Sequence, residues 1–65
     1  MEITLSDGRV VRVLLIDIAH NYVDWEFLEV PGHNRTEVAL TDYASALTEI
    51  QEAIEIDLGL IEGGE

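Results

Sequence analysis

The first part of the chain alternates polar and apolar residues with the period of a β-strand. Residues 2–6 read Glu-Ile-Thr-Leu-Ser, and this period of two is typical of a strand with one buried face. Asp7 and Gly8 follow directly, and Asp-Gly between two strand-like segments favours a tight hairpin turn in which both central residues have positive φ. The returning segment, residues 9–18, is rich in β-branched residues and apolar on both faces. It is therefore predicted to be a central strand or one covered on both sides.

Regular alternation along residues 9–18 predicts two apolar rows on opposite faces. One row holds Val11, Val13 and Leu15, and the other holds Val10, Leu14 and Ile16.

A third and a fourth strand are predicted after a connection at residues 19–21. Residues 23–27 alternate strictly, so Val23, Trp25 and Phe27 are expected in the core, with Asp24 and Glu26 on the outside. The alternation slips at Phe27-Leu28, which predicts a bulge or a sharp twist there. Residues 31–34 have the composition of a turn, and residues 35–40 form the fourth predicted strand, with Val38 and Leu40 inward.

The C-terminal part has the period of an amphipathic helix. Thr41 or Asp42 is expected to cap its start, because a side-chain oxygen there accepts from free backbone N–H groups. The predicted apolar stripe consists of Tyr43, Leu47, Ile50, Ile54 and Leu58. Gly59 stands where a left-handed residue ends a helix, with Leu60 able to fold back on the stripe.

These elements predict an α+β fold: a four-stranded antiparallel sheet of two hairpins with one C-terminal amphipathic helix packed on one face. Residues 1–62 are expected to form a single compact domain, and residues 63–65 a frayed tail.

The charge of the chain indicates that this small domain is a binding protein. The 65 residues include 14 Asp and Glu and three Arg, and the formal net charge is −11. The hydrophobic fraction of 48% excludes a disordered acidic tail. Solubility needs a net charge of only about 2–8 in magnitude, so the excess predicts a basic partner. The alternative is a protein from a high-salt organism, in which acidic surfaces are general.

The carboxylates are concentrated in the second half of the chain. The first 36 residues hold six acids and three Arg, whereas residues 37–65 hold eight acids and no base. The predicted polar face of the helix lacks the mixed charges that give stabilising i,i+4 pairs. Glu52 and Glu55 also lie in its later half, where the helix dipole disfavours anions. A role in contact with a partner would explain both features.

Eight carboxylates are therefore predicted to contact the partner, because they lie on the outer face of the third strand, on the polar face of the helix or between the two. They are Asp24, Glu26, Glu29, Glu37, Asp42, Glu49, Glu52 and Glu55.

The spacing of these residues permits mimicry of a nucleic-acid backbone. Alternate residues of a strand stand about 6.6–6.8 Å apart, and duplex DNA carries a charge about every 3.4 Å along each strand. Rows such as Asp24/Glu26/Glu29 and Glu49/Glu52/Glu55 are thus candidates to stand in for successive phosphates, although any acidic strand or helix has this spacing.

Catalytic chemistry is not evident in the sequence. There is no Cys, so a disulfide and a thiolate metal site are excluded. His20 and His33 fall in predicted loops without the spacing of a zinc site. We therefore expect a non-enzyme without metal or cofactor. Tyr22 and Tyr43 are candidate contact residues, because Tyr is favoured at interfaces.

The expected location is the cytoplasm. The start of the chain has neither the basic nor the apolar region of a signal peptide. Its longest apolar run is too short to span a membrane, and anionic lipid repels an anionic surface. The expected state is a monomer or weak homodimer that binds protein, not nucleic acid or membrane. Gly63-Gly64 resembles the end of ubiquitin-like sulfur carriers, but here Glu65 follows the glycines and the predicted helix comes last.

In length, acidity and cytoplasmic character the whole chain resembles the small acidic anti-CRISPR proteins of bacterial phages and mobile elements, several of which are DNA mimics. These proteins share no diagnostic motif, so the resemblance assigns no residues. It implies an inhibitor that prevents target-DNA binding by a CRISPR surveillance complex, with a type I Cascade in the bacterial host cell as the expected target. Residues 3–10 also resemble the first hairpin of small bacterial domains often encoded beside toxin–antitoxin genes. The alternative function is an antitoxin-like or accessory subunit that neutralises a basic protein through a hydrophobic interface.

Overall fold

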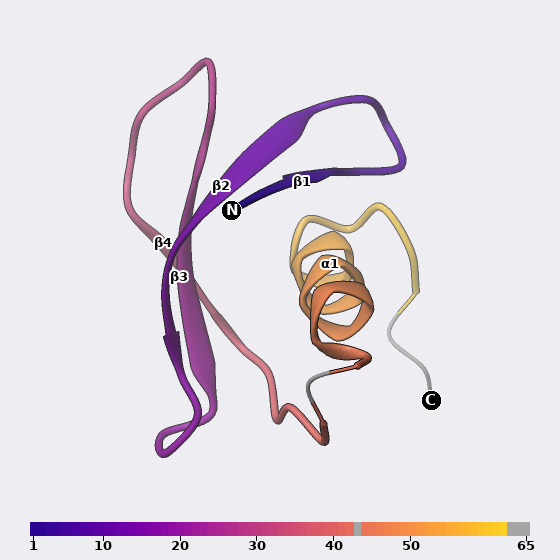
Figure 1. The fold of residues 1–65 in the computed structure, drawn as a ribbon. Helices are drawn as coiled ribbons and strands as arrows, with labels where there is room; N and C mark the ends of the chain where they lie inside the picture. The colour runs from indigo at the N-terminus through magenta and orange to yellow at the C-terminus, as the bar shows by residue number, and fades with distance from the viewer. Residues whose placement is uncertain (43, 63–65) are drawn as a thin grey trace.

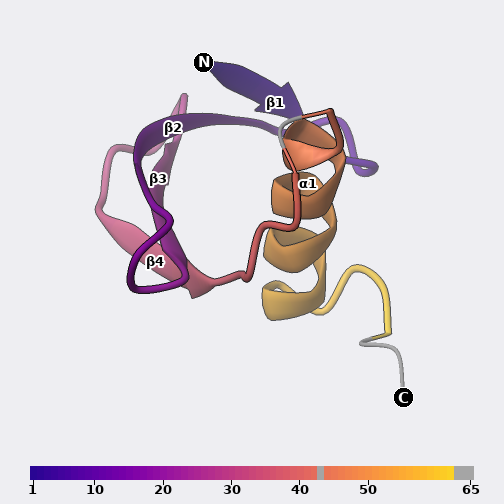
Figure 2. The ribbon, with the colours of Figure 1, turned by 60° about the horizontal axis from the view of Figure 1, so that its bottom comes forward.

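Four antiparallel strands lie side by side in chain order and are followed by one helix (Figure 1). The computed structural model describes residues 1–42 and 44–62, so Tyr43 and the predicted tail at 63–65 lie outside the described residues. The elements are β1 (Glu2–Thr4), β2 (Val10–Asp17), β3 (Tyr22–Phe27), β4 (Asn34–Glu37) and α1 (Ala46–Asp57). Figures 1 and 2 show α1 on the concave side of the curved sheet. The predicted α+β fold is confirmed.

The first hairpin turn is one residue longer than predicted. Gly8 N donates to the carbonyl of Leu5 at 3.0 Å, and Leu5 N donates to the carbonyl of Arg9 at 2.7 Å. Gly8 has φ +94°, whereas Asp7 is not among the positive-φ residues. The connection is therefore a three-residue loop with a left-handed glycine at its end. The Asp7 carboxylate accepts from Arg9 N at 3.0 Å, which stabilises the turn.

A bulge in β2 reverses the predicted alternation of this strand. The register with β3 shifts between Val13, which pairs with Trp25, and Leu15, which pairs with Asp24. Leu14 is the extra residue, and an extra residue moves every later side chain to the opposite face. Ile16, which pairs with Val23, consequently shares the core face with Val11 and Val13. Regular alternation would place Leu15 in that row. At Phe27-Leu28, where a bulge or a sharp twist was predicted, β3 ends, so no bulge occurs there.

The core lies between the inner face of the sheet and two turns of α1. Its buried apolar residues are Ile3, Leu5, Val11, Val23, Trp25, Ile50 and Ile54. Trp25 and Phe27 are in edge-to-face contact with ring centroids 5.1 Å apart. The predicted inward residues Val38 and Leu40 pack against this core, although β4 has already ended.

The helix starts later than predicted and ends as predicted. Ser45 is at the N-cap, and the Asp42 carboxylate accepts from Ser45 N at 3.0 Å, so it closes the turn before the helix. At the C-terminus Gly59 has φ +78°. Gly59 N donates to the Ile56 carbonyl at 3.0 Å and Leu60 N to the Glu55 carbonyl at 2.8 Å, which is a Schellman motif. Leu60 packs against the core.

A search of the described residues for a helix that is both long and apolar enough to cross a membrane finds none.

Candidate functional site

The three arginines each lie beside a carboxylate of this chain. Arg9 Nε is 2.6 Å from Asp7 Oδ2, and Arg35 Nε is 2.7 Å from Asp24 Oδ1. The Arg12 guanidinium lies 3.5 Å from Glu26 and, through its other terminal nitrogen, 3.9 Å from Glu2. The chain has no Lys, so its fixed positive charge is neutralised internally.

Asp24 is on the outer face of the sheet, as predicted, but it is enclosed there. It is only 5% exposed, because Arg35 contacts both of its oxygens, at 2.7 and 3.2 Å. His33 Nε2 lies 3.0 Å from Oδ2, and the Arg35 guanidinium stacks over the Tyr22 ring, 3.9 Å from its centroid. The hydrogen bonds from Arg35 hold the pKa of Asp24 below its ordinary value. The expectation that this carboxylate is free on the surface is wrong.

Glu55 is also buried, at 5% exposure, although the helical period placed it on the polar face. The first hairpin lies against this side of α1, and Ser6 N donates to Glu55 Oε2 at 2.7 Å. Gln51 Nε2 donates to the same oxygen at 3.1 Å. The Gln51 hydrogen bond, followed by that from Ser6, lowers the pKa of Glu55. Glu55 therefore joins the first hairpin to the helix and is not available at the surface.

Two further predicted contact residues are partly occupied within the chain. Glu49 accepts from Thr41 N at 3.1 Å and from Thr41 Oγ1 at 2.6 Å, which holds the segment entering α1. Glu26 is half-buried beside Arg12.

Four of the eight predicted carboxylates remain exposed: Glu29, Glu37, Asp42 and Glu52. Asp42 bonds to Ser45 N. The side chains of the other three enter none of the hydrogen bonds or ion pairs formed within residues 1–42 and 44–62. Each of the two predicted phosphate-like rows thus keeps one open carboxylate, Glu29 in the first and Glu52 in the second. The structure does not bring the eight together in one continuous row.

A buried polar connection that sequence periodicity could not reveal ties the sheet to the end of α1. Trp25 Nε1 donates to Thr36 Oγ1 at 2.9 Å, and Thr36 Oγ1 donates to Asp57 Oδ2 at 2.8 Å. Thr36 is buried. Asp57 therefore also contributes to the fold.

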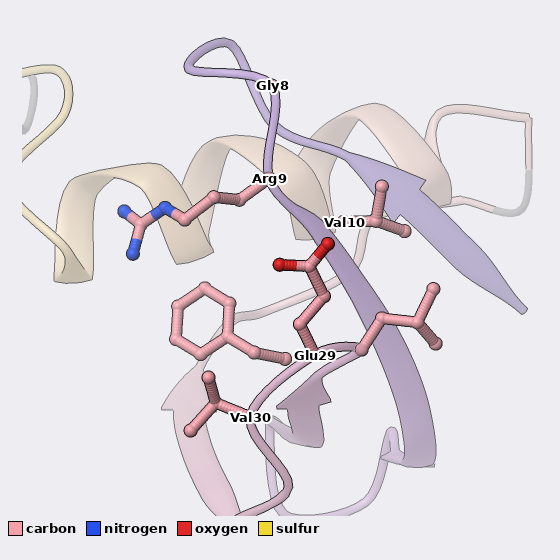
Figure 3. A pocket seen from close by; sticks show the side chains of 7 residues that line it. Gly8, Arg9, Val10, Glu29 and Val30 are labelled. Carbon is pink, nitrogen blue, oxygen red and sulfur yellow. The ribbon is translucent and has the colours of Figure 1, made fainter.

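A hollow of about 380 Å³ opens between the first hairpin turn and the loop after β3 (Figure 3). Figure 3 shows the side chains of Arg9, Glu29 and Val30 around it. The Arg9 guanidinium lies over the Phe27 ring, 4.8 Å from its centroid. The hollow therefore has apolar walls with one charge of each sign at its edge.

An apolar groove runs between the C-terminal half of β2 and the start of α1. Two adjoining hollows of about 300 and 230 Å³ share Ile18, Leu40 and Ala46 in their walls. We call this surface the edge groove, and its apolar walls are Met1, Ile16, Ile18, Leu40, Ala46 and Leu47. Leu47, predicted in the buried stripe, is 53% exposed there, because α1 turns mainly Ile50 and Ile54 toward the sheet. The exposed carboxylate Asp42 lines the smaller hollow.

His20 and His33 are both in loops, as predicted, and each ring contacts one Asp. His20 Nδ1 is 3.1 Å from Asp17, and His33 Nε2 is 3.0 Å from Asp24. Among residues 1–42 and 44–62, no three His, Cys, Asp or Glu side chains are grouped so as to hold a metal ion.

The chain matches no protein-family model, no curated protein and no solved structure.

Proposed function

We propose that this chain is a non-catalytic inhibitor that binds a basic nucleic-acid-binding protein and excludes DNA from it. The observation that carries the proposal is the net charge of −11 on a chain whose three Arg are all in ion pairs. A protein with a large negative net charge is attracted to a basic channel, and this attraction accelerates encounter. A protein that fills such a channel gains from the same counterion release that drives DNA binding.

The contact residues favoured by the structure are Glu29, Glu37 and Glu52, with Asp42 as a fourth. They are exposed, and the side chains of the first three enter no hydrogen bond or ion pair within residues 1–42 and 44–62, so a partner can bind them without breaking one. Asp24 and Glu55 hold the fold instead. The inhibition we propose acts through these separate open carboxylates, because the predicted phosphate-like rows are interrupted.

The resemblance to small acidic anti-CRISPR proteins directs the proposal to one target. The chain would occupy the large subunit of a type I surveillance complex, at the surface that reads the target duplex and its PAM. Duplex DNA and this chain would then compete for the same basic groups.

A competition assay tests this proposal. Purified type I surveillance complex is incubated with labelled target duplex and increasing amounts of the protein at several salt concentrations. We expect displacement of the duplex, and the affinity of the protein for the complex should fall steeply as salt rises. Binding that is unchanged at high salt, or that leaves the duplex in place, would contradict the proposal.

Two matched triple variants separate specific carboxylates from total charge. Glu29→Gln/Glu37→Gln/Glu52→Gln removes three negative charges, and Thr4→Lys/Ala39→Lys/Thr48→Lys adds three positive charges. Each variant thus makes the net charge three units less negative, through exposed positions. Circular dichroism should show both folded. The Gln variant should lose more inhibition than the Lys variant; equal losses would show that total charge acts without these carboxylates.

The second candidate, an antitoxin-like or accessory subunit, is favoured by a different observation. Nine large apolar side chains are exposed among the described residues, and four of them, Met1, Ile18, Val30 and Leu47, are more than half exposed. A partner that covers them would bind with weak salt dependence. Retained binding by the Gln variant and loss on Leu47→Lys would select this candidate.

A further inference from the structure

One edge of β2 has no strand beside it along its second half. β1 pairs with β2 at residues 10–12, and Val13 N donates to the Met1 carbonyl at 2.8 Å. On its other side β2 stays paired with β3 as far as Asp17. Figure 1 shows β2 running on past the N-terminus. Within the described residues, residues 14–17 therefore present an unpaired strand edge about 13 Å long at 3.3 Å per residue.

This edge carries a bulge at Leu14 and one charge, Asp17, but no other protection of an open strand. Exposed edges are normally made short, charged or covered, because their backbone groups pair with other chains. Residues 14–17 read Leu-Leu-Ile-Asp, and Leu14 and Leu15 are each nearly half exposed. The edge is thus apolar except at its last residue.

The edge groove lies directly against the unpaired edge. Ile16 belongs to both, since it is a residue of β2 and lines the larger hollow. Leu47 and Ala46 of α1 form the opposite wall. A segment that paired with the edge would therefore place alternate side chains among apolar groups in the groove, and backbone and side-chain recognition would coincide.

We propose that the edge groove and the open edge of β2 bind an extended segment of a basic partner by strand addition. The segment alternates apolar residues, which enter the groove, with Lys or Arg, which face the solvent side. Asp17 lies on the outer face at the end of the edge, since it pairs there with Tyr22, and Asp42 lines the smaller hollow of the groove. The net charge of −11 disfavours a second copy of the chain as occupant.

This inference rests on the proposed function for the basic character of the partner. It goes further by naming the site and the conformation of the bound segment.

A short capped peptide in which Lys and Val alternate is the probe, with an N-methylated peptide of the same sequence as the control. Binding is measured by calorimetry, and amide hydrogen exchange at residues 14–17 reports strand pairing. We expect the exchange to slow on binding. N-methylation keeps charge and side chains but removes backbone donors, so it should weaken binding by about tenfold or more. Equal affinity for both peptides would overturn strand addition.

Three Lys substitutions at exposed apolar positions locate the site. Leu47→Lys and Ile18→Lys lie on opposite walls of the edge groove, whereas Val30→Lys lies at the other hollow. All three change the charge equally and should fold, because the side chains are more than half exposed. Binding should weaken by about tenfold or more in the first two and by less than about threefold in Val30→Lys. A similar loss in all three would overturn the site.

The oligomeric state and the DNA competition assay complete the test. Self-association of the wild type that Leu47→Lys abolishes would overturn the basic partner in favour of a second copy. If the Gln variant keeps full competition against DNA, the proposed inhibition fails whatever the peptide does. If Leu47→Lys and Ile18→Lys bind the peptide as the wild type does, while the Gln variant loses competition against DNA, the proposed groove site is wrong and the proposed inhibition is supported.

Discussion

The Glu55 carboxylate, near the end of α1, accepts a hydrogen bond from the backbone N–H of Ser6 in the first hairpin turn at 2.7 Å. The two residues are 49 positions apart in the chain, so this bond joins the first element of the fold to the last. A buried carboxylate is tolerated only where donors satisfy it, and Gln51 supplies the second donor. Helical period predicts Glu55 on a binding face, but its carboxylate in fact stabilises the fold.

Removing this charge should reduce stability at neutral pH and flatten its dependence on acid. The pKa of Glu55 is lowered in the folded protein. Its contribution is therefore complete above the ordinary pKa of the unfolded chain and is lost as pH falls through the lower folded value. Glu55→Gln should be less stable than the wild type at neutral pH, with a smaller difference in strong acid. Urea unfolding at a series of pH values measures both effects.

Glu52→Gln is the control for that series, because Glu52 is exposed on the same helix. It should leave the wild-type acid dependence in place. Parallel curves for the wild type and Glu55→Gln would contradict the role given to Glu55.

Replacing Thr36 by Val should destabilise the protein by about 1–3 kcal/mol, because the Trp25 indole N–H would be buried without an acceptor. Asp57 would lose a donor at the same time. Thr36→Ser keeps the hydroxyl and should lose less. Urea unfolding followed by the fluorescence of Trp25 measures the difference; equal stability of the Val and Ser variants would show that the hydrogen bonds contribute little.

Gly59→Ala should cost about 1–2 kcal/mol, because a side chain disfavours the left-handed conformation that Gly59 adopts at φ +78°. Gly32→Ala is the matched control. At both positions an added Cβ meets no atom within 4 Å, and Gly32 lacks a positive φ. Thermal unfolding should show the control unchanged or stabilised by about 0.4–1 kcal/mol. Equal effects at both glycines would contradict the conformational explanation.

Ile50→Ala should destabilise the fold by about 2–5 kcal/mol, because its side chain is fully buried. Leu47 belongs to the same predicted stripe but is 53% exposed, so Leu47→Ala should cost less than about 1 kcal/mol. Chemical denaturation of the two variants gives this comparison. Similar losses would mean that Leu47 is covered in solution.

Much of the fold was predictable because the signals that specify it are local. Strict alternation at residues 23–27 identified β3, and Gly59 with Leu60 identified the end of α1. The phase of β2 was not predictable, because Leu14 fits a regular strand as well as a bulge. Only pairing with β3 shows which of the two occurs.

The candidate site was less predictable than the fold. Helical period placed Glu55 among surface carboxylates, and strand period placed Asp24 outside. Periodicity within one element cannot predict the hydrogen bonds that Ser6 and Arg35 donate to Glu55 and Asp24, because these donors come from distant parts of the chain. The edge groove was missed because its walls come from segments that are distant in the chain: Met1, the end of β2 with Ile18, Leu40 and the start of α1.

By itself the sequence determined the order of the strands and the helix, the excess of negative charge and the absence of Lys and Cys. These properties depend on composition and on periods within a few residues. Only the tertiary structure decided which carboxylates are open to a partner and which apolar residues stay exposed. The physical reason is that a carboxylate is buried only where donors satisfy it, and for Asp24 and Glu55 these include donors from another strand and from a turn.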